Sequence, residues 1–148
     1  MNVDHVLVTT DLSEASLRPL EAAADFARSQ EAQLSILYVL EEVEAMAHGS
    51  AHGLFSPADA DKAKQAAEDR LAMLLGQATC LEGLTIHPAT IQATSVWRGV
   101  NAYVDAHGVD LIVMATHKNG ILERIFGTKA DGIMHHATVP VLSMPPKG

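Results

Sequence analysis

The 148-residue sequence has little cysteine and no long hydrophobic run. Its single cysteine, Cys80, cannot form a disulfide within the chain, and the amino terminus lacks the basic and apolar regions of a secretory signal. Apolar runs such as residues 109–115 are far shorter than the ~20 residues of a membrane-spanning helix. We therefore expect a cytoplasmic protein that does not enter a membrane.

Positive charge is also scarce. The chain has 10 Lys and Arg against 18 Asp and Glu, which gives a formal net charge of −8. Nucleic acids and anionic membranes are bound by clustered Lys and Arg, so neither is an expected partner. The length fits one ordinary domain, and we expect a single domain over residues 1–148.

The first part of the sequence alternates short apolar runs with helical patterns. Residues 6–8 predict a strand that ends at a polar turn, and residues 13–29 predict a helix with one apolar stripe. Residues 34–40 are almost continuously apolar, as in a parallel strand buried on both faces. Residues 41–57 lose this periodicity and predict a mobile loop.

The remainder continues the alternation. The patterns predict helices over residues 57–76, 95–108 and 128–136, and strands over residues 84–93, 110–114 and 139–142. The last strand contains Pro140, which cannot donate to a ladder, so we place this strand at a sheet edge or at an interface. The sequence thus predicts an α/β domain with a doubly wound, five-stranded parallel sheet and helices on both faces. Ligands of such sheets bind beyond the carboxyl ends of the strands.

Four segments together resemble one known family. They are VLVTTDLS (residues 6–13), VDLIVM (109–114), GILERIFGT (120–128) and HATVPVL (136–142). In order and spacing they resemble the first strand, fourth strand, glycine loop with final helix, and final strand of the universal stress proteins. The resemblance covers nearly the whole chain, and it implies an adenine nucleotide α-hydrolase-like fold.

The nucleotide signature of that family is only partly kept. It has two glycines three apart, then nine residues, then Gly followed by Ser or Thr. Here Ala115 and Lys118 stand where the first glycines would be, and eight residues separate Lys118 from Gly127. A Cβ at these positions obstructs positive φ and the approach of backbone N–H groups to phosphate. Gly120 can still supply positive φ, and Gly127 with Thr128 retains a phosphate seat at a helix start.

The resemblance implies binding of ATP or AMP without a catalytic residue. By similarity Asp11 would contact ribose, the backbone near Thr10 and Val39 would frame adenine, and Gly127 with Thr128 would hold phosphate. The residues assigned to the site are Thr10, Asp11, Val39, Ala115, Thr116, His117, Gly120, Gly127 and Thr128. The chain would have no metal of its own, and Mg²⁺ would enter only with nucleotide.

The resemblance also implies a homodimer through the last strand, at Val139, Val141 and Leu142, and an unidentified protein partner. Two alternatives stay open: a dimeric interaction protein that binds no nucleotide, which the missing glycines favour, and a weak adenine nucleotide hydrolase. The sequence argues against a conventional enzyme, because no Walker-type Gly-Lys-Ser exists and no nucleophile stands beside a base. Eight histidines do not form a metal motif with three converging ligands.

Overall fold

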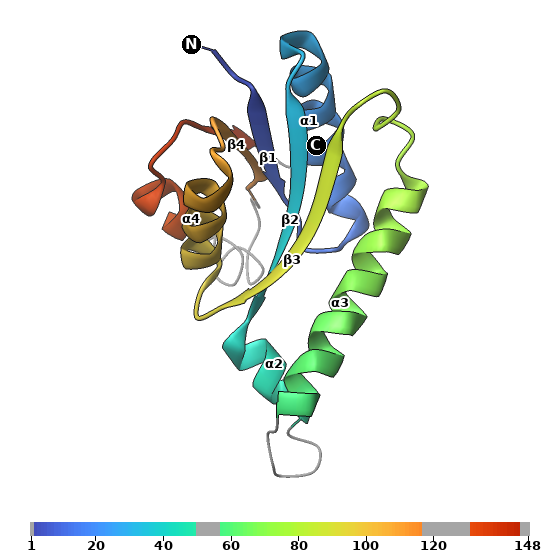
Figure 1. Ribbon diagram of the computed structural model, residues 1–148, viewed down its shortest axis with the longest axis vertical. Helices are drawn as coiled ribbons and strands as arrows, with labels where there is room; N and C mark the ends of the chain where they lie inside the picture. The colour runs from blue at the N-terminus through green and yellow to red at the C-terminus, as the bar shows by residue number, and fades with distance from the viewer. Residues whose placement is uncertain (1, 50–56, 117–130, 146–148) are drawn as a thin grey trace.

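A five-stranded parallel sheet forms the centre of the computed structural model, which describes residues 2–49, 57–116 and 131–145 (Figure 1). Along the sheet the strand order is β3-β2-β1-β4-β5, and each pair of neighbours is parallel. The strands are β1 (His5–Thr9), β2 (Gln33–Glu41), β3 (Ile86–Ala93), β4 (Leu111–Ala115) and β5 (Val141–Met144). This order and direction confirm the doubly wound α/β class predicted from the sequence.

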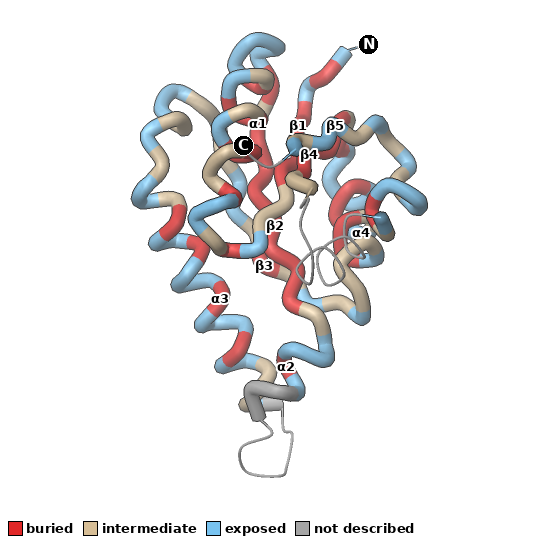
Figure 2. Tube along the Cα trace, turned by 180° about the vertical axis from the view of Figure 1, so that it is seen from behind, coloured by how far each residue is buried: buried red, intermediate tan, exposed pale blue. Residues whose placement is uncertain are grey.

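The two faces of the sheet bury alternate residues of the same strands. Val6 and Val8 of β1 belong to the core on one face, whereas Leu7 belongs to the core on the other. Figure 2 shows buried residues along β1, β2 and β4. Because both faces are covered, these three strands have no polar face, which is why their sequences are almost continuously apolar.

Helices cover both faces. On one face α1 (Leu17–Gln30), which follows a short 3₁₀ turn at Glu14–Ser16, and α3 (Pro57–Gln77) pack against the sheet. On the other face lie α4 (Val96–His107) and the helical residues 131–136 (Figure 1). Gly108 ends α4 with φ of 64°, a left-handed conformation that costs glycine little. The helix end predicted there is confirmed.

Two predictions from the sequence need correction. Residues 42–49, expected in a mobile loop, form α2 (Glu42–Gly49), while residues 50–56 lie outside the described residues. The last strand begins at Val141 and not at Val139, because Pro140 precedes the ladder and only its carbonyl takes part, accepting from Ile112 N–H at 3.0 Å. Its place at the sheet edge is as predicted, and β3, with Pro88, forms the other edge.

Candidate functional site

A pocket lies at the carboxyl ends of the three central strands. Strand order reverses beside β1, so the chain leaves β1 and β4 in opposite directions and opens a crevice between their ends. The lining combines a polar turn with apolar side chains from both faces of the sheet. It consists of Thr9, Thr10, Asp11, Ala15, Ser16, Pro19, Leu37, Tyr38, Val39, Val96, Met114, Ala115 and Ile133.

The turn after β1 is held by its own side chains. Thr10 Oγ1 accepts from Leu12 N–H at 3.0 Å and donates to Ser16 Oγ at 2.8 Å. Ser16 Oγ in turn donates to the carbonyl of Ser13 at 2.6 Å. Leu12 has a φ of 69° and is buried, so this hydroxyl chain holds a backbone conformation that residues other than glycine adopt rarely.

Asp11 presents a carboxylate at the mouth of the pocket. Its Oδ1 accepts from Ser13 N–H at 2.9 Å and from Ser13 Oγ at 2.5 Å, the arrangement of an Asx turn. Asp11 is exposed, and within the described residues its Oδ2 accepts no hydrogen bond. The side chain therefore stabilises the turn with one oxygen, while the other faces no hydrogen-bond donor among the described residues.

The apolar side of the pocket depends on a close contact between β2 and α4. A Cβ on Gly99 would lie 2.7 Å from Cγ1 and 2.9 Å from Cγ2 of Val39. Glycine therefore lets the first turn of α4 approach the end of β2, which brings Val96 into the lining opposite Val39. Val39, whose backbone was predicted to frame adenine, thus packs against α4, the helix that follows β3.

Tyr38 connects the pocket to α2. Its hydroxyl donates to Glu44 Oε2, which ties α2 to the strand that precedes it. Burial, followed by the hydrogen bond to Glu44, raises the pKa of Tyr38 well above its usual value, so the phenol stays neutral. Sequence reasoning missed Tyr38 because it occurs inside an apolar run and resembles a core residue.

The structure brings together four of the predicted site residues. Thr10, Asp11, Val39 and Ala115 line the pocket. Thr116 follows Ala115 and donates its N–H to the carbonyl of Met144 at 2.9 Å, which ties it to β5. His117, Gly120, Gly127 and Thr128 lie outside the described residues.

Several pocket residues were not predicted. Ser16, Val96 and Ile133 belong to no motif, Met114 was placed only in a buried strand, and packing of their elements brings all four to the crevice. Across the described ranges, no three His, Cys, Asp or Glu side chains converge as a metal site, and no helix is long and apolar enough to cross a membrane.

Comparison with known proteins identifies the family of this chain. A model described as the universal stress protein family matches residues 2–145. Universal stress protein A homolog 1 of Coxiella burnetii is 28% identical over 144 residues, covering 97% of each chain. Among solved structures, a universal stress protein in complex with cAMP has a TM-score of 0.61 and 21% identity, with 97% of this chain and 98% of that chain covered. One from Archaeoglobus fulgidus in complex with dAMP has a TM-score of 0.61 and 18% identity, with the same coverage.

Proposed function

Because the chain belongs to the universal stress protein family, we propose that it is a regulatory domain that binds an adenine nucleotide in the pocket at the carboxyl ends of β1, β2 and β4. The observation that carries the proposal is the pairing, in one crevice, of the exposed Asp11 carboxylate with an apolar wall. Two proteins of this fold were crystallised with cAMP and with dAMP, which supports an adenine nucleotide as the ligand.

The apolar and polar parts of the lining suit different parts of a nucleotide. Val39, Val96 and Met114 offer apolar surface to a planar base, and Asp11 Oδ2 is available to accept from ribose hydroxyls. A carboxylate repels phosphate, so the phosphates must extend away from Asp11. We propose that they extend towards the segment that contains Gly127 and Thr128, the predicted phosphate seat.

Regulation, and not catalysis, is the proposed outcome of binding. Of the hydroxyls in the turn, those of Thr10 and Ser16 line the pocket, and both are already paired, since Thr10 donates to Ser16 and Ser16 donates to a carbonyl. Neither hydroxyl has a histidine or carboxylate as its partner, so neither is activated as a nucleophile. Occupancy would instead change the shape of the protein or its affinity for a partner.

The substitution Asp11→Asn tests the proposal. Asparagine keeps Oδ1 as an acceptor for Ser13 and so preserves the turn, but it removes the charge and replaces the free acceptor with a donor. We expect ATP and AMP to bind about ten- to a hundredfold more weakly, because hydrogen bonds to charged groups contribute ~1.5–3 kcal/mol. Calorimetric titration measures this. Asp61→Asn, an exposed acid on α3, is the matched control and should bind as the wild type does.

A second candidate is a family member that acts through protein contacts alone. The specific observation in its favour is Ala115, whose methyl group occupies the pocket lining where the family signature has glycine. Nucleotide analysis of the denatured, purified protein separates the two candidates. If no nucleotide is released and neither ATP nor AMP binds at millimolar concentration, nucleotide binding is excluded and this second function stands.

A further inference from the structure

Trp97 lies where two elements of the pocket wall meet. α4 contributes Val96 to the lining, and the helical residues 131–136 contribute Ile133. The indole of Trp97, next to Val96, stacks on the imidazole of His136 with ring centroids 3.7 Å apart and planes 14° from parallel. The chain's single tryptophan therefore joins the two helical elements that enclose one side of the crevice.

Gly132 makes this contact unusually close. A Cβ at Gly132 would lie 2.8 Å from Cδ1 and 3.4 Å from Cγ of Trp97, nearer than a methyl group can approach a ring without displacement. Gly132 and His136 are four residues apart and so share one helix face, which packs against the indole. Only glycine lets the helical residues sit at this distance from α4.

Two side chains contact the indole and oppose its movement away from an added methyl group. His136 stacks on it, and the guanidinium Cζ of Arg98 lies 4.9 Å from its ring centroid. Asn101 Nδ2 also donates to the carbonyl of His136 at 2.8 Å, a second link between α4 and residues 131–136. A side chain at position 132 would therefore displace the helical residues.

Such a displacement would reach the pocket directly. Ile133 follows Gly132, is only 4% exposed, and packs in the same core as Val39 and Met114. We propose that Trp97 and Gly132 are positioning residues for nucleotide binding: their contact sets the distance of Ile133 from the base-binding wall. This inference rests on the proposed function of the pocket.

Gly132→Ala tests the inference, with ATP and AMP as probes in calorimetric titrations. We expect binding about tenfold weaker, equivalent to ~1.4 kcal/mol of overpacking transmitted to the pocket. The control is Gly76→Ala, because a Cβ at this α3 position meets no atom within 4 Å, and it should bind as the wild type does. The fluorescence of Trp97 should change on Gly132→Ala and stay unchanged on Gly76→Ala.

A double-mutant cycle separates positioning from a general loss of structure. In a Trp97→Ala background the opposing ring is gone, so adding Gly132→Ala should weaken binding less than twofold further. If Gly132→Ala does not fold, Trp97→Phe tests the same contact by changing its other partner. The smaller ring packs less closely against Gly132, so the helical residues 131–136 are held less firmly. That variant should also bind more weakly at an unchanged urea midpoint.

The outcomes are distinct. Wild-type affinity in Gly132→Ala together with altered Trp97 fluorescence overturns the positioning role and leaves the proposed function intact. Equal further losses from Gly132→Ala with and without Trp97 overturn it as well. Wild-type protein that binds neither nucleotide overturns the proposed function, and this inference with it. Weaker binding that depends on Trp97 supports the inference.

Discussion

His5 is a buried polar residue at the amino end of β1, opposite the pocket. Its Nδ1 faces the carbonyl of His107 at 3.0 Å and must donate to it, so Nε2 accepts from Ser35 Oγ at 2.6 Å. Ser35 Oγ then accepts from the hydroxyl of Tyr103 at 2.8 Å. This chain joins β1, β2 and α4, and burial favours the neutral His5 ring, in which Nδ1 donates and Nε2 accepts.

The free energy of unfolding should therefore depend on the charge of His5. Burial lowers the pKa of His5 and outweighs the hydrogen bond to the carbonyl of His107, which raises it. The neighbouring rings of His87 and His107 lower this pKa by smaller amounts, and Asp110 raises it slightly. The unfolded chain takes up this proton near pH 6.5, and the folded chain takes it up only at a lower pH. Stability is thus complete above ~pH 6.5 and decreases as the pH falls below it, by as much as ~1.4 kcal/mol per pH unit.

Urea unfolding between pH 7.5 and 5.5 measures this effect. His5→Gln should flatten the dependence over this interval, because the titrating ring is absent. His135→Gln is the control, since His135 is exposed, and it should keep the wild-type slope. If the free energy of unfolding of His5→Gln still falls with pH as steeply as in the wild type, groups other than His5 cause the pH dependence.

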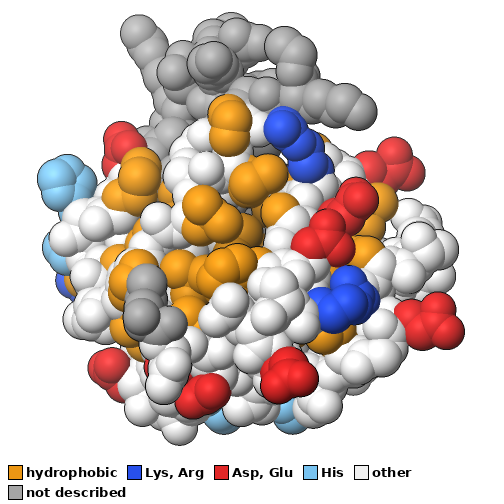
Figure 3. Space-filling view, turned by 90° about the horizontal axis from the view of Figure 1, so that it is seen from above, with side chains coloured by type: hydrophobic (Ala, Val, Ile, Leu, Met, Phe, Trp, Pro, Cys, Tyr) orange, Lys and Arg blue, Asp and Glu red, His pale blue; other side chains and the backbone are white. Residues whose placement is uncertain are grey.

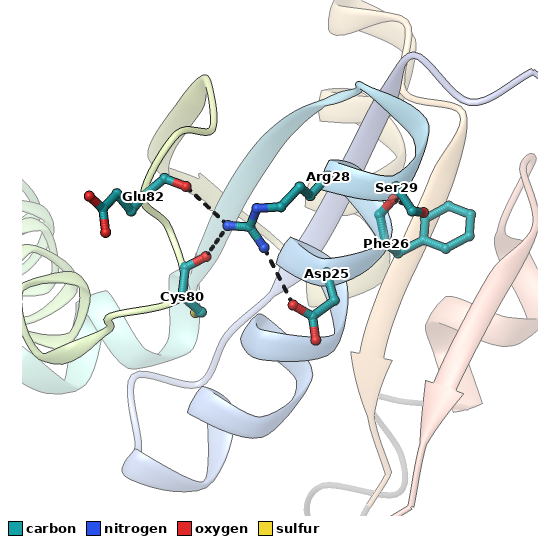
Figure 4. A network of polar contacts seen from close by, with 6 residues as sticks. All are labelled: Asp25, Phe26, Arg28, Ser29, Cys80 and Glu82. Carbon is teal, nitrogen blue, oxygen red and sulfur yellow. Dashed lines mark hydrogen bonds and ion pairs between the residues drawn. The ribbon is translucent and has the colours of Figure 1, made fainter.

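At the scale of elements, Arg28 links α1 to the connection between α3 and β3. Figure 4 shows its guanidinium between the carbonyls of Cys80 and Glu82, at 2.7 Å and 3.0 Å from one nitrogen. The other terminal nitrogen pairs with Asp25 at 3.4 Å. The planar guanidinium thus donates to two backbone carbonyls in the connection, where neither α3 nor β3 supplies a hydrogen-bond donor.

We expect Arg28→Ala to lower the free energy of unfolding by ~1 kcal/mol, since two partly exposed hydrogen bonds are lost. Native-state proteolysis within residues 78–85 should also become faster. Asp25→Asn removes only the exposed ion pair and should cost less than ~0.5 kcal/mol, which separates the carbonyl bonds from the salt bridge. Equal effects of the two substitutions in urea unfolding would contradict the role of the carbonyls.

At the scale of the whole molecule, β5 leaves one sheet edge available. Leu142 is 41% exposed, and β4 is the only strand that pairs with β5 in the part of the chain described. On the face seen in Figure 3, hydrophobic side chains gather near the centre, and the described Lys and Arg side chains stand apart from one another. β5 itself carries Val141, Leu142 and Met144 and no Lys or Arg, so this edge is suited to a second protein chain and not to phosphate groups.

We therefore expect a homodimer through β5, and Leu142→Glu should dissociate it. A carboxylate buried in a dimer interface without a partner is costly, so the substitution should shift the protein to monomer at micromolar concentration. Sedimentation or light scattering measures the change. Met73→Glu is the control, since Met73 is 69% exposed on α3, and it should leave the assembly unchanged. A wild-type monomer would remove the proposal.

Much of the fold could be predicted because its signals are local. The continuous apolar runs of β1, β2 and β4 specify strands buried on both faces, and Gly108 marks a helix end by itself. α2 was missed because it has no apolar stripe: Val43 and Met46 are exposed, and Ala45 is buried. Its position depends on the bond between Glu44 and Tyr38, which no periodicity encodes.

By itself the sequence determined the strands, the polar residues that follow them and the family-like order of motifs. These place Asp11 and Ala115 together at the carboxyl ends of the strands. Only the tertiary structure decided which apolar residues complete the pocket and which polar groups pair. Ile133 reaches the crevice because Gly132 lets its helix approach Trp97, and burial in the packed core lowers the pKa of His5. These contacts join residues distant in the chain, and their energies depend on distance and burial, which arise only when the elements pack.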